Sequence, residues 1–303
     1  MPTAKGSAPK LPEPLLRIVE ARHHDPFEVL GRHVSEGRAI VRAFLPQAES
    51  ATLVEAQAAL HRIEGTDLFV WEGDASQVPE RYRIAWQDAA GVTHQDYDPY
   101  CFPAQLADFD LHLFGEGRHW HADRFLGSHV REVEGVSGVQ FAVWAPNADR
   151  VSVVGDFNGW DGRAHPMRVR GGTGVWELFV PGLATGGYYK YELRDHASHI
   201  HIKIDPYAQS FQERPQTAGL ICPETAFRWT DADWMTARAE ANWQHRAFSV
   251  YEIHLGSWRR DSDGNFVNYR ILARELADYV TELGFTHIEL LPITEHPLDA
   301  SWG

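Results

Sequence analysis

The feature that most constrains this chain is an internal repeat. Five short blocks recur in the same order, and the offset between the copies grows from 100 at Val41 and Phe141 to 107 at Pro99 and Pro206. The matched blocks are VLGRH (29–33) with FLGSH (125–129), VRAFLPQAESATLVE (41–55) with FAVWAPNADRVSVVG (141–155), LFVWEG (68–73) with WELFVPG (176–182), RYRIAW (81–86) with YYKYEL (188–193), and DYDPYCF (96–102) with KIDPYAQSF (203–211). Kept order and spacing indicate a duplicated domain, whose second copy gains about seven residues around GDFNGWDGR.

Each copy is a series of short alternating runs broken by Pro, Gly, Asn and Asp. In VQFAVWAP (139–146), for example, Val139, Phe141 and Val143 alternate with the residues between them. Runs of this length and spacing predict antiparallel strands of a β-sandwich. We therefore expect a tail and short helix over 1–23, a first β-sandwich over 24–107 and a second over 108–225.

The periodicity changes near the C-terminus. After a helical linker over 226–247, residues 248–303 read as a strand, a helix and a second strand. Leu272, Leu276, Tyr279, Val280 and Leu283 fall at steps of three and four, with Asn268 as N-cap and Gly284 just past the helix end. HIELLPI (287–293) is apolar at most positions, which is typical of a strand in a buried parallel sheet. One such βαβ unit is the opening of a (β/α)₈ barrel, which needs about 250 residues, so the barrel is expected to be incomplete.

Composition excludes several classes of partner. The net charge of −14, from 28 basic and 42 acidic residues, argues against nucleic acid. No apolar run is long enough to span a membrane, and the N-terminus lacks the apolar core of a signal peptide. Two cysteines, Cys101 and Cys222, exclude a disulfide framework and fit a reducing cytoplasm. The 11 tryptophans suit the flat faces of sugar rings, although most tryptophans are core residues.

Four stretches carry a family resemblance, which covers about residues 22–303. VYEIHLGSWRR (250–260) and LGFTHIELLPITEHPLDASWG (283–303) closely resemble the opening of the catalytic barrel of 1,4-α-glucan branching enzymes, in the α-amylase superfamily. VWAPNADRVSVVGDFNGWDGRAHPM (143–167) resembles the immunoglobulin-like, carbohydrate-binding module that precedes that barrel. HDPFEVLGRH (24–33) resembles the extra N-terminal module of long bacterial members.

The resemblance implies a glycosyltransferase of glycogen biosynthesis. Such an enzyme cleaves an α-1,4-glucan and transfers the released chain to a 6-hydroxyl, by double displacement with retention of configuration. The family places its nucleophilic Asp, its acid–base Glu and its stabilising Asp on later barrel strands, so no catalytic residue is assigned here and the chain alone is expected to be inactive. Glu252, Glu289 and Glu295 sit in no family catalytic motif, and Glu289 is expected to make a buried hydrogen bond or ion pair.

Three residues match glucan contacts of the module class. Trp160 in GDFNGW matches a Trp that stacks on glucose, but it could equally pack on its own domain. Lys190 matches a Lys that reaches sugar hydroxyls, and strand alternation puts it on the solvent face, opposite Tyr189 and Tyr191. Trp176 matches a common Trp of the module but shares its face with core residues. The stretch after Lys190 lacks the second Trp of strong surface sites, and the first copy has no counterpart of FNGW.

The remaining candidates are weaker. His296 and Trp302 follow the second barrel strand and are expected to line the glucan cleft. His199 and His201 share a strand face, but no carboxylate or Cys stands at ligand spacing, so no metal and no cofactor are expected. Expected partners are glycogen or other α-glucan chains, bound by a monomer. A glycogen-binding protein without activity and a debranching or trehalose-releasing hydrolase remain as alternatives.

Overall fold

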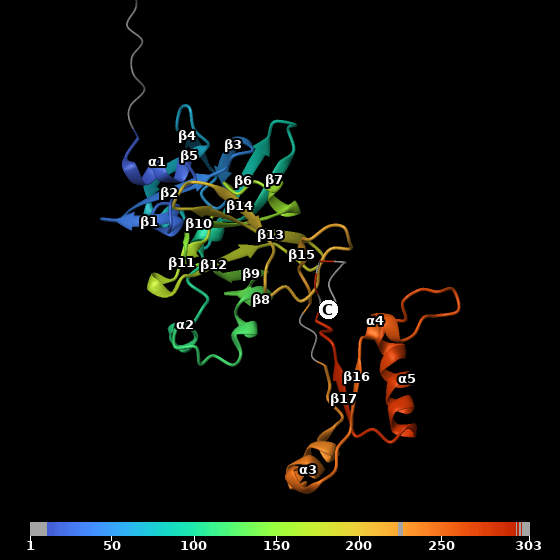
Figure 1. Ribbon diagram of the computed structural model, residues 1–303. Coiled ribbons are helices and arrows are strands. Elements are labelled where there is room, and N and C mark those ends of the chain that lie inside the picture. Colours follow the sequence, from blue (N-terminus) through green and yellow to red (C-terminus); the bar gives the residue numbers. More distant parts are fainter. Residues whose placement is uncertain (1–10, 224–226, 295, 297, 299–303) are drawn as a thin grey trace, which may run out of the picture. The chain divides into compact units, whose positions relative to one another are not determined.

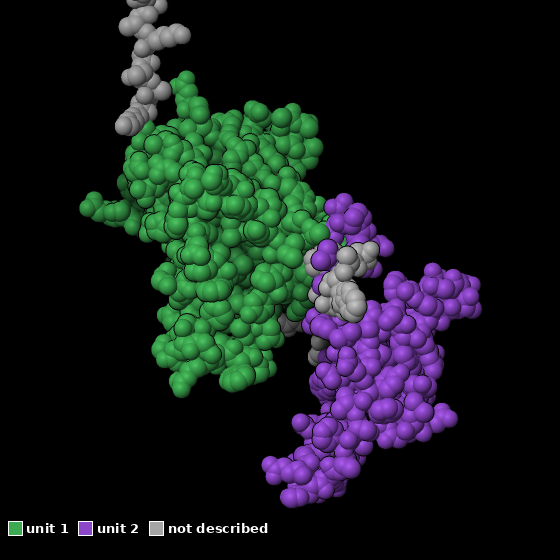
Figure 2. All heavy atoms as spheres, in the orientation of Figure 1, with its two compact units in different colours: residues 1–212, 217–224 green, residues 213–216, 225–303 purple. Residues whose placement is uncertain are grey.

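The computed structural model describes residues 11–223, 227–294, 296 and 298 (Figure 1). The chain divides into two compact units (Figure 2): unit 1 holds Met1–Gln212 and Thr217–Glu224, and unit 2 holds Glu213–Gln216 and Thr225–Gly303. Both copies of the repeat lie in unit 1. None of the described helices is long and apolar enough to cross a membrane.

The first copy forms one seven-stranded sheet with the order β1-β2-β5-β4-β3-β6-β7. A two-sheet sandwich was predicted; here β4 joins the two halves, because its first residues pair with β3 and its last pair with β5. The halves still enclose one core, which includes Val41, Leu53, Phe69 and Ile84. The strands are β1 (Gly31–Ser35), β2 (Arg38–Phe44), β3 (Ala48–Leu53), β4 (Ala58–Arg62), β5 (Leu68–Asp74), β6 (Arg83–Asp88) and β7 (Thr93–Tyr97), preceded by helix α1 (Glu13–Val19).

The second copy is a sandwich of two four-stranded sheets. One has the order β11-β12-β9-β8, and the other has β10-β13-β14 with β15 added to β13. The strands are β8 (Gly127–Val133), β9 (Val136–Trp144), β10 (Ala148–Gly155), β11 (Arg168–Val169), β12 (Val175–Pro181), β13 (Tyr188–Asp195), β14 (Ile200–Lys203) and β15 (Gly219–Leu220), and helix α2 (Asp108–Gly115) connects the copies. The equivalent strands of the two copies pair in the same way, since β1-β2-β5 corresponds to β8-β9-β12 and β3-β6-β7 to β10-β13-β14.

A buried tyrosine–aspartate bond recurs at equivalent places in the two copies. Tyr82 Oη donates to Asp98 Oδ2 at 2.5 Å, and Tyr189 Oη donates to Asp205 Oδ2 at 2.6 Å. All four residues are buried. Burial raises the pKa of Asp98 to about 6 and also raises that of Asp205. The predicted duplication therefore extends to individual hydrogen bonds.

The repeated Leu-Gly-x-His block has the same role in each copy. Gly31 and Gly127 have φ of +88° and +102°, and each lies against the carbonyl of a tyrosine, Tyr100 or Tyr207. A Cβ at Gly31 would lie 2.7 Å from the Tyr100 oxygen. The histidine two residues later donates from Nε2 back to the leucine carbonyl, at 3.0 Å in the first copy and 2.9 Å in the second.

Unit 2 contains the predicted strand–helix–strand order. Strands β16 (Val250–Ile253) and β17 (His287–Leu290) are parallel, and α5 (Tyr269–Glu282) connects them; α3 (Ala232–Glu240) and α4 (Leu255–Trp258) are shorter. Asn268 Oδ1 accepts from Ile271 N at 3.1 Å, which confirms the predicted N-cap. Gly284, with φ of +78°, ends the helix, and Phe285 N bonds to Val280 O at 3.0 Å. That this unit opens a barrel stays a prediction.

Two expectations for unit 2 are wrong. Leu272, Leu276 and Val280 are buried, but Leu283, the C-cap residue of α5, is 53% exposed. Glu289 is exposed, and so is every residue of β17, because this strand pairs only with β16 in the described part of the chain. A strand with one neighbour and no covering layer cannot bury a carboxylate.

Candidate functional site

Trp160 lies on a rigid turn at the end of β10. Its φ is +62°, which is rare for a bulky residue and is a strained conformation that collects at functional sites. The Trp160 amide donates to Gly155 O at 3.0 Å, and its indole Nε1 donates to Asp156 Oδ1 at 3.0 Å. Asn158 supports the turn from inside, since it accepts from Gly155 N and donates to Val153 O, both at 3.0 Å. The indole ring is held in place and remains 39% exposed.

Lys190 lies at the same end of this sheet. The register pairs Lys190 with Val154 and pairs Tyr189 with Gly155, which is bonded to the Trp160 backbone. Tyr189 and Tyr191 are buried, as the alternation predicted, and Lys190 is half-buried. Its Nζ donates to Thr217 Oγ1 at 2.8 Å, and an ammonium group carries three donors in all. An aromatic face and an ammonium group therefore share one end of the second module.

A buried ion pair stabilises the turn that carries Trp160. Arg150 is 1% exposed, forms an ion pair with Glu192, and donates from Nη1 to Ser152 Oγ at 2.6 Å and to Gly162 O at 2.5 Å. A Cβ at position 162 would lie 2.1 Å from Glu192 Oε1, so a side chain there would displace the carboxylate that pairs with Arg150. The loop that carries Trp160 is thus tied at both of its ends.

Trp176 is not the glucan contact that its module match suggested, and the alternative, a core residue, is confirmed. Its side chain is 2% exposed, and its indole Nε1 donates to Ala145 O at 3.0 Å inside the sandwich. Along β12 the alternation turns Trp176, Leu178 and Val180 into the same core. The buried position of Trp176 leaves its indole out of reach of a ligand.

His199 and His201 have a carboxylate beside them, which sequence spacing missed. The turn between β13 and β14 brings Asp195 Oδ2 to 2.9 Å from His201 Nε2 and 3.3 Å from His199 Nδ1. The hydrogen bond from His201, more than any other contact, lowers the pKa of Asp195 to about 2. No group of three or more His, Cys, Asp or Glu with metal-binding geometry occurs among the described residues.

The predicted cleft residues lie in unit 2. His296 Nδ1 is 2.9 Å from Thr294 O and the residue is half-buried, while Trp302 lies outside the described residues. His254, at the end of β16, lies with its Nδ1 2.9 Å from Ser257 Oγ. Whether His296 or Trp302 lines a glucan cleft stays a prediction.

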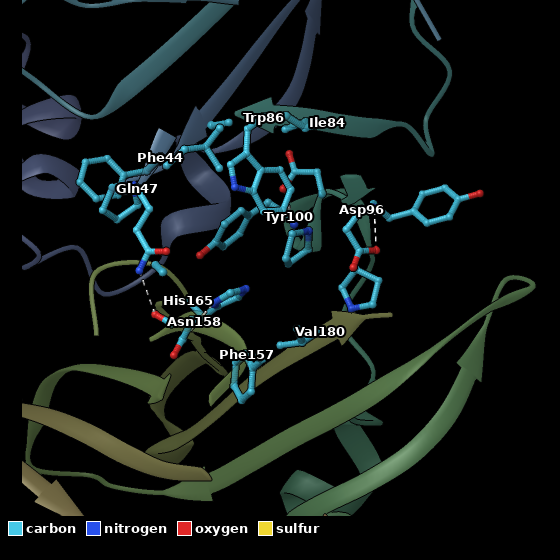
Figure 3. A pocket seen from close by; sticks show the side chains of 18 of the residues that line it. Phe44, Gln47, Ile84, Trp86, Asp96, Tyr100, Phe157, Asn158, His165 and Val180 are labelled. Carbon is cyan, nitrogen blue, oxygen red and sulfur yellow. Dashed lines mark hydrogen bonds between the residues drawn. The ribbon is translucent and has the colours of Figure 1, made fainter. Parts of the chain in front are cut away.

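Sequence reasoning also missed a cavity within unit 1, between the two modules (Figure 3). Its volume is about 170 Å³. The first module contributes Phe44, Gln47, Trp86, Asp96 and Tyr100, and the second contributes Phe157, Asn158, His165 and Val180. The loop that carries Trp160 forms one wall, so this cavity adjoins the candidate site. Only the packing of one copy on the other creates it, and no single motif encodes that packing.

Comparison with known proteins supports the resemblance. Residues 125–208 match Carbohydrate-binding module 48 (Isoamylase N-terminal domain), and residues 12–100 match the alpha-1,4-glucan branching enzyme GlgB, N-terminal domain. The 1,4-alpha-glucan branching enzyme GlgB of Methylococcus capsulatus is 57% identical over 288 residues, which is 95% of this chain and 39% of that protein. The same enzyme of Nitrosococcus oceani is 55% identical over 98% of this chain and 40% of its own length. The chain is therefore a relative of the 1,4-alpha-glucan branching enzymes and matches the N-terminal two fifths of their length.

Proposed function

We propose that this chain is the glucan-binding N-terminal part of a 1,4-α-glucan branching enzyme of glycogen biosynthesis. The observation that carries the proposal is Trp160, presented half-exposed on a strained turn at the same end of the sheet as Lys190, within the stretch that matches carbohydrate-binding module 48. The whole enzyme would cleave an α-1,4-glucan and transfer the released chain to a 6-hydroxyl with retention of configuration. We assign none of its catalytic carboxylates to the described residues.

The binding chemistry follows from the two side chains. The Trp160 indole offers an apolar face to the C–H groups of a glucose ring, while its Nε1–H is already used by Asp156. The Lys190 ammonium offers donors to the hydroxyl oxygens at the ring edge. Because the contacts are few and partly exposed, we expect the binding of a single glucose unit at this site to be weak. We also propose that the protein is a cytoplasmic monomer.

Affinity electrophoresis in gels containing glycogen tests the proposal. The wild-type chain should be retarded, and Trp160→Ala should weaken retention about tenfold, the equivalent of roughly 1.4 kcal/mol of stacking energy. Trp120→Ala is the matched control, because Trp120 is a 92% exposed tryptophan of the same unit outside the site. Equal retention of the Trp160 and Trp120 variants would contradict the proposal.

A second readout separates binding from activity. The 303-residue chain spans about 40% of the relatives it matches, so it should bind glycogen yet leave the iodine staining of amylose unchanged. Loss of staining would place catalytic residues within this chain and overturn the assignment.

A further inference from the structure

The cavity between the modules has the volume of a site for one small ring. A cavity of about 150 Å³ holds one benzene ring, and the cavity here measures about 170 Å³. On the side of the first module it is lined by Trp86, Tyr100 and the exposed residue Gln47. Trp86 is held in place by stacking on His94, with ring centroids 5.4 Å apart.

Two polar groups reach this space with hydrogen-bonding capacity to spare. Asp96 is half-buried, and its carboxylate accepts one bond, from Tyr97 N at 2.8 Å. Burial raises the pKa of Asp96 from its usual value, as expected for a carboxylate without a compensating cation. Figure 3 shows Asp96, Tyr100 and His165 around the same open space. The cavity thus contains an acceptor that a bound hydroxyl group could satisfy.

His165 supplies a donor. Asn158 Nδ2 donates to His165 Nδ1 at 3.0 Å, and the orientation of the Asn158 amide is fixed by its backbone partners Gly155 and Val153. Because Nδ1 accepts, the proton of the neutral ring is on Nε2. Burial lowers the pKa of His165 to about 4, so the ring is neutral at pH 7. His165 therefore offers an N–H, and Asp96 offers lone pairs.

The charges around the cavity select among ligands. Among the described residues that line it there are two carboxylates, Asp96 and Asp98, and neither Lys nor Arg. A phosphate ester would meet like charge and no cation, so sugar phosphates and nucleotide sugars are disfavoured. A neutral ring with hydroxyl groups fits both the aromatic wall and the acceptor–donor pair.

We propose that this inter-module cavity binds a single neutral hexose, the terminal glucose unit of an α-glucan chain. The ring lies against Trp86 and Tyr100, one hydroxyl donates to Asp96, and another accepts from His165 Nε2. The inference rests on the proposed function for its choice of glucose, but it assigns a second site, distinct from the exposed surface at Trp160. The end of a glucan chain bound here would contact both modules at once.

Titration of the 303-residue chain with glucose, followed by calorimetry and tryptophan fluorescence, tests the proposal. Glucose is the probe because one ring fills the cavity. Asp96→Asn should weaken glucose binding about tenfold, since it removes the charged acceptor and keeps the shape. Ala164→Leu should abolish binding by filling the cavity, which Ala164 lines. Asp123→Asn, at an exposed aspartate of the same unit, is the matched control and should bind as wild type. Glucose 6-phosphate should bind at least tenfold more weakly than glucose.

The outcomes separate this inference from the proposed function. If glycogen retards the wild-type chain but glucose binds equally to wild type, Asp96→Asn and Ala164→Leu, only the cavity site is refuted. If glucose binding is sensitive to both substitutions but glycogen does not retard the chain, the cavity site stands and the proposed function fails. Should Asp96→Asn not fold, Ala164→Leu alone decides, and glucose 6-phosphate binding as tightly as glucose overturns the proposal in either case.

Discussion

Replacing Glu177 by glutamine should destabilise unit 1 strongly. The Glu177 side chain is fully buried on β12. Its Oε1 accepts from Arg170 Nη1 at 2.8 Å and lies 3.4 Å from Arg168 Nε. Its Oε2 accepts from the amides of Gln105 and Leu106, both at 3.0 Å, and from Gln140 Nε2 at 3.1 Å. One carboxylate thus holds the connection between the modules against the second sandwich.

The expected loss of stability follows from the fact that an amide cannot accept hydrogen bonds at both of its terminal atoms. A glutamine has one acceptor oxygen, so its NH₂ group must face either Arg170 or the two backbone amides, and a donor then meets a donor. Removing one partner of a buried ion pair costs about 3–5 kcal/mol, and each stranded backbone donor about 1–3 kcal/mol. We expect Glu177→Gln to lower the free energy of unfolding of unit 1 by about 3–5 kcal/mol, because relaxation recovers part of the sum.

The matched control uses the other carboxylate partner of Arg170. Asp108 Oδ1 accepts from Arg170 Nη2 at 2.8 Å, but the Asp108 side chain is 95% exposed. Asp108→Asn should therefore cost less than about 1 kcal/mol. Urea unfolding, followed by tryptophan fluorescence, should show a midpoint lower by about 2 M for Glu177→Gln and nearly unchanged for Asp108→Asn. Similar midpoints for the two variants would refute the reasoning that burial makes Glu177 decisive.

Two further predictions concern the features that both copies share, the buried tyrosine–aspartate bond and the Leu-Gly-x-His turn. The pKa of Asp98 is about 6 in the folded state, above its unfolded value, so its contribution to stability is present below about pH 4 and is lost as the pH rises through 6. Asp98→Asn should therefore reduce the difference in unfolding free energy between pH 4 and pH 7 by up to about 3 kcal/mol. Parallel pH profiles for variant and wild type would contradict this. Gly31→Ala should lower the midpoint of thermal unfolding more than Gly37→Ala. Both glycines have positive φ, but only a Cβ at Gly31 meets a neighbour, the Tyr100 oxygen at 2.7 Å. The φ penalty common to both is about 1–2 kcal/mol, so equal losses would show that the close contact relaxes freely.

Much of the structure of unit 1 could be predicted because the same pattern of short alternating blocks occurs twice in the sequence. Alternation within the repeated blocks determined which face of β13 is buried, so Tyr189 and Tyr191 were assigned correctly and Lys190 was placed on the opposite face. The cap and end of α5 were also correct, since Asn268 and Gly284 act through local backbone chemistry. Local rules succeed where all the atoms of an interaction lie within a few residues.

The sequence predictions failed where contacts between segments distant in sequence determine the surroundings of a residue. Trp176 matched a module position, but only the packed sandwich shows that it bonds to Ala145 O and cannot reach a ligand. The proximity of Asp195 to His199 and His201 depends on the register of β13 and β14. Likewise, the cavity beside Asp96 exists only because two modules about 100 residues apart in sequence pack together. Periodicity carries no information on such contacts.

The short insertion in the second copy accounts for the asymmetry between the modules. Both copies keep the buried tyrosine–aspartate bond and the Leu-Gly-x-His turn, so the frame is the same. The insertion adds the turn with Trp160 and also reaches the first copy, since Gln47 Nε2 lies 3.5 Å from Asn158 O and Arg163 Nη1 lies 3.5 Å from Asp67 Oδ2. The same residues therefore present an aromatic ring to solvent and close the inter-module cavity. The loop that distinguishes the two copies therefore lies where they meet.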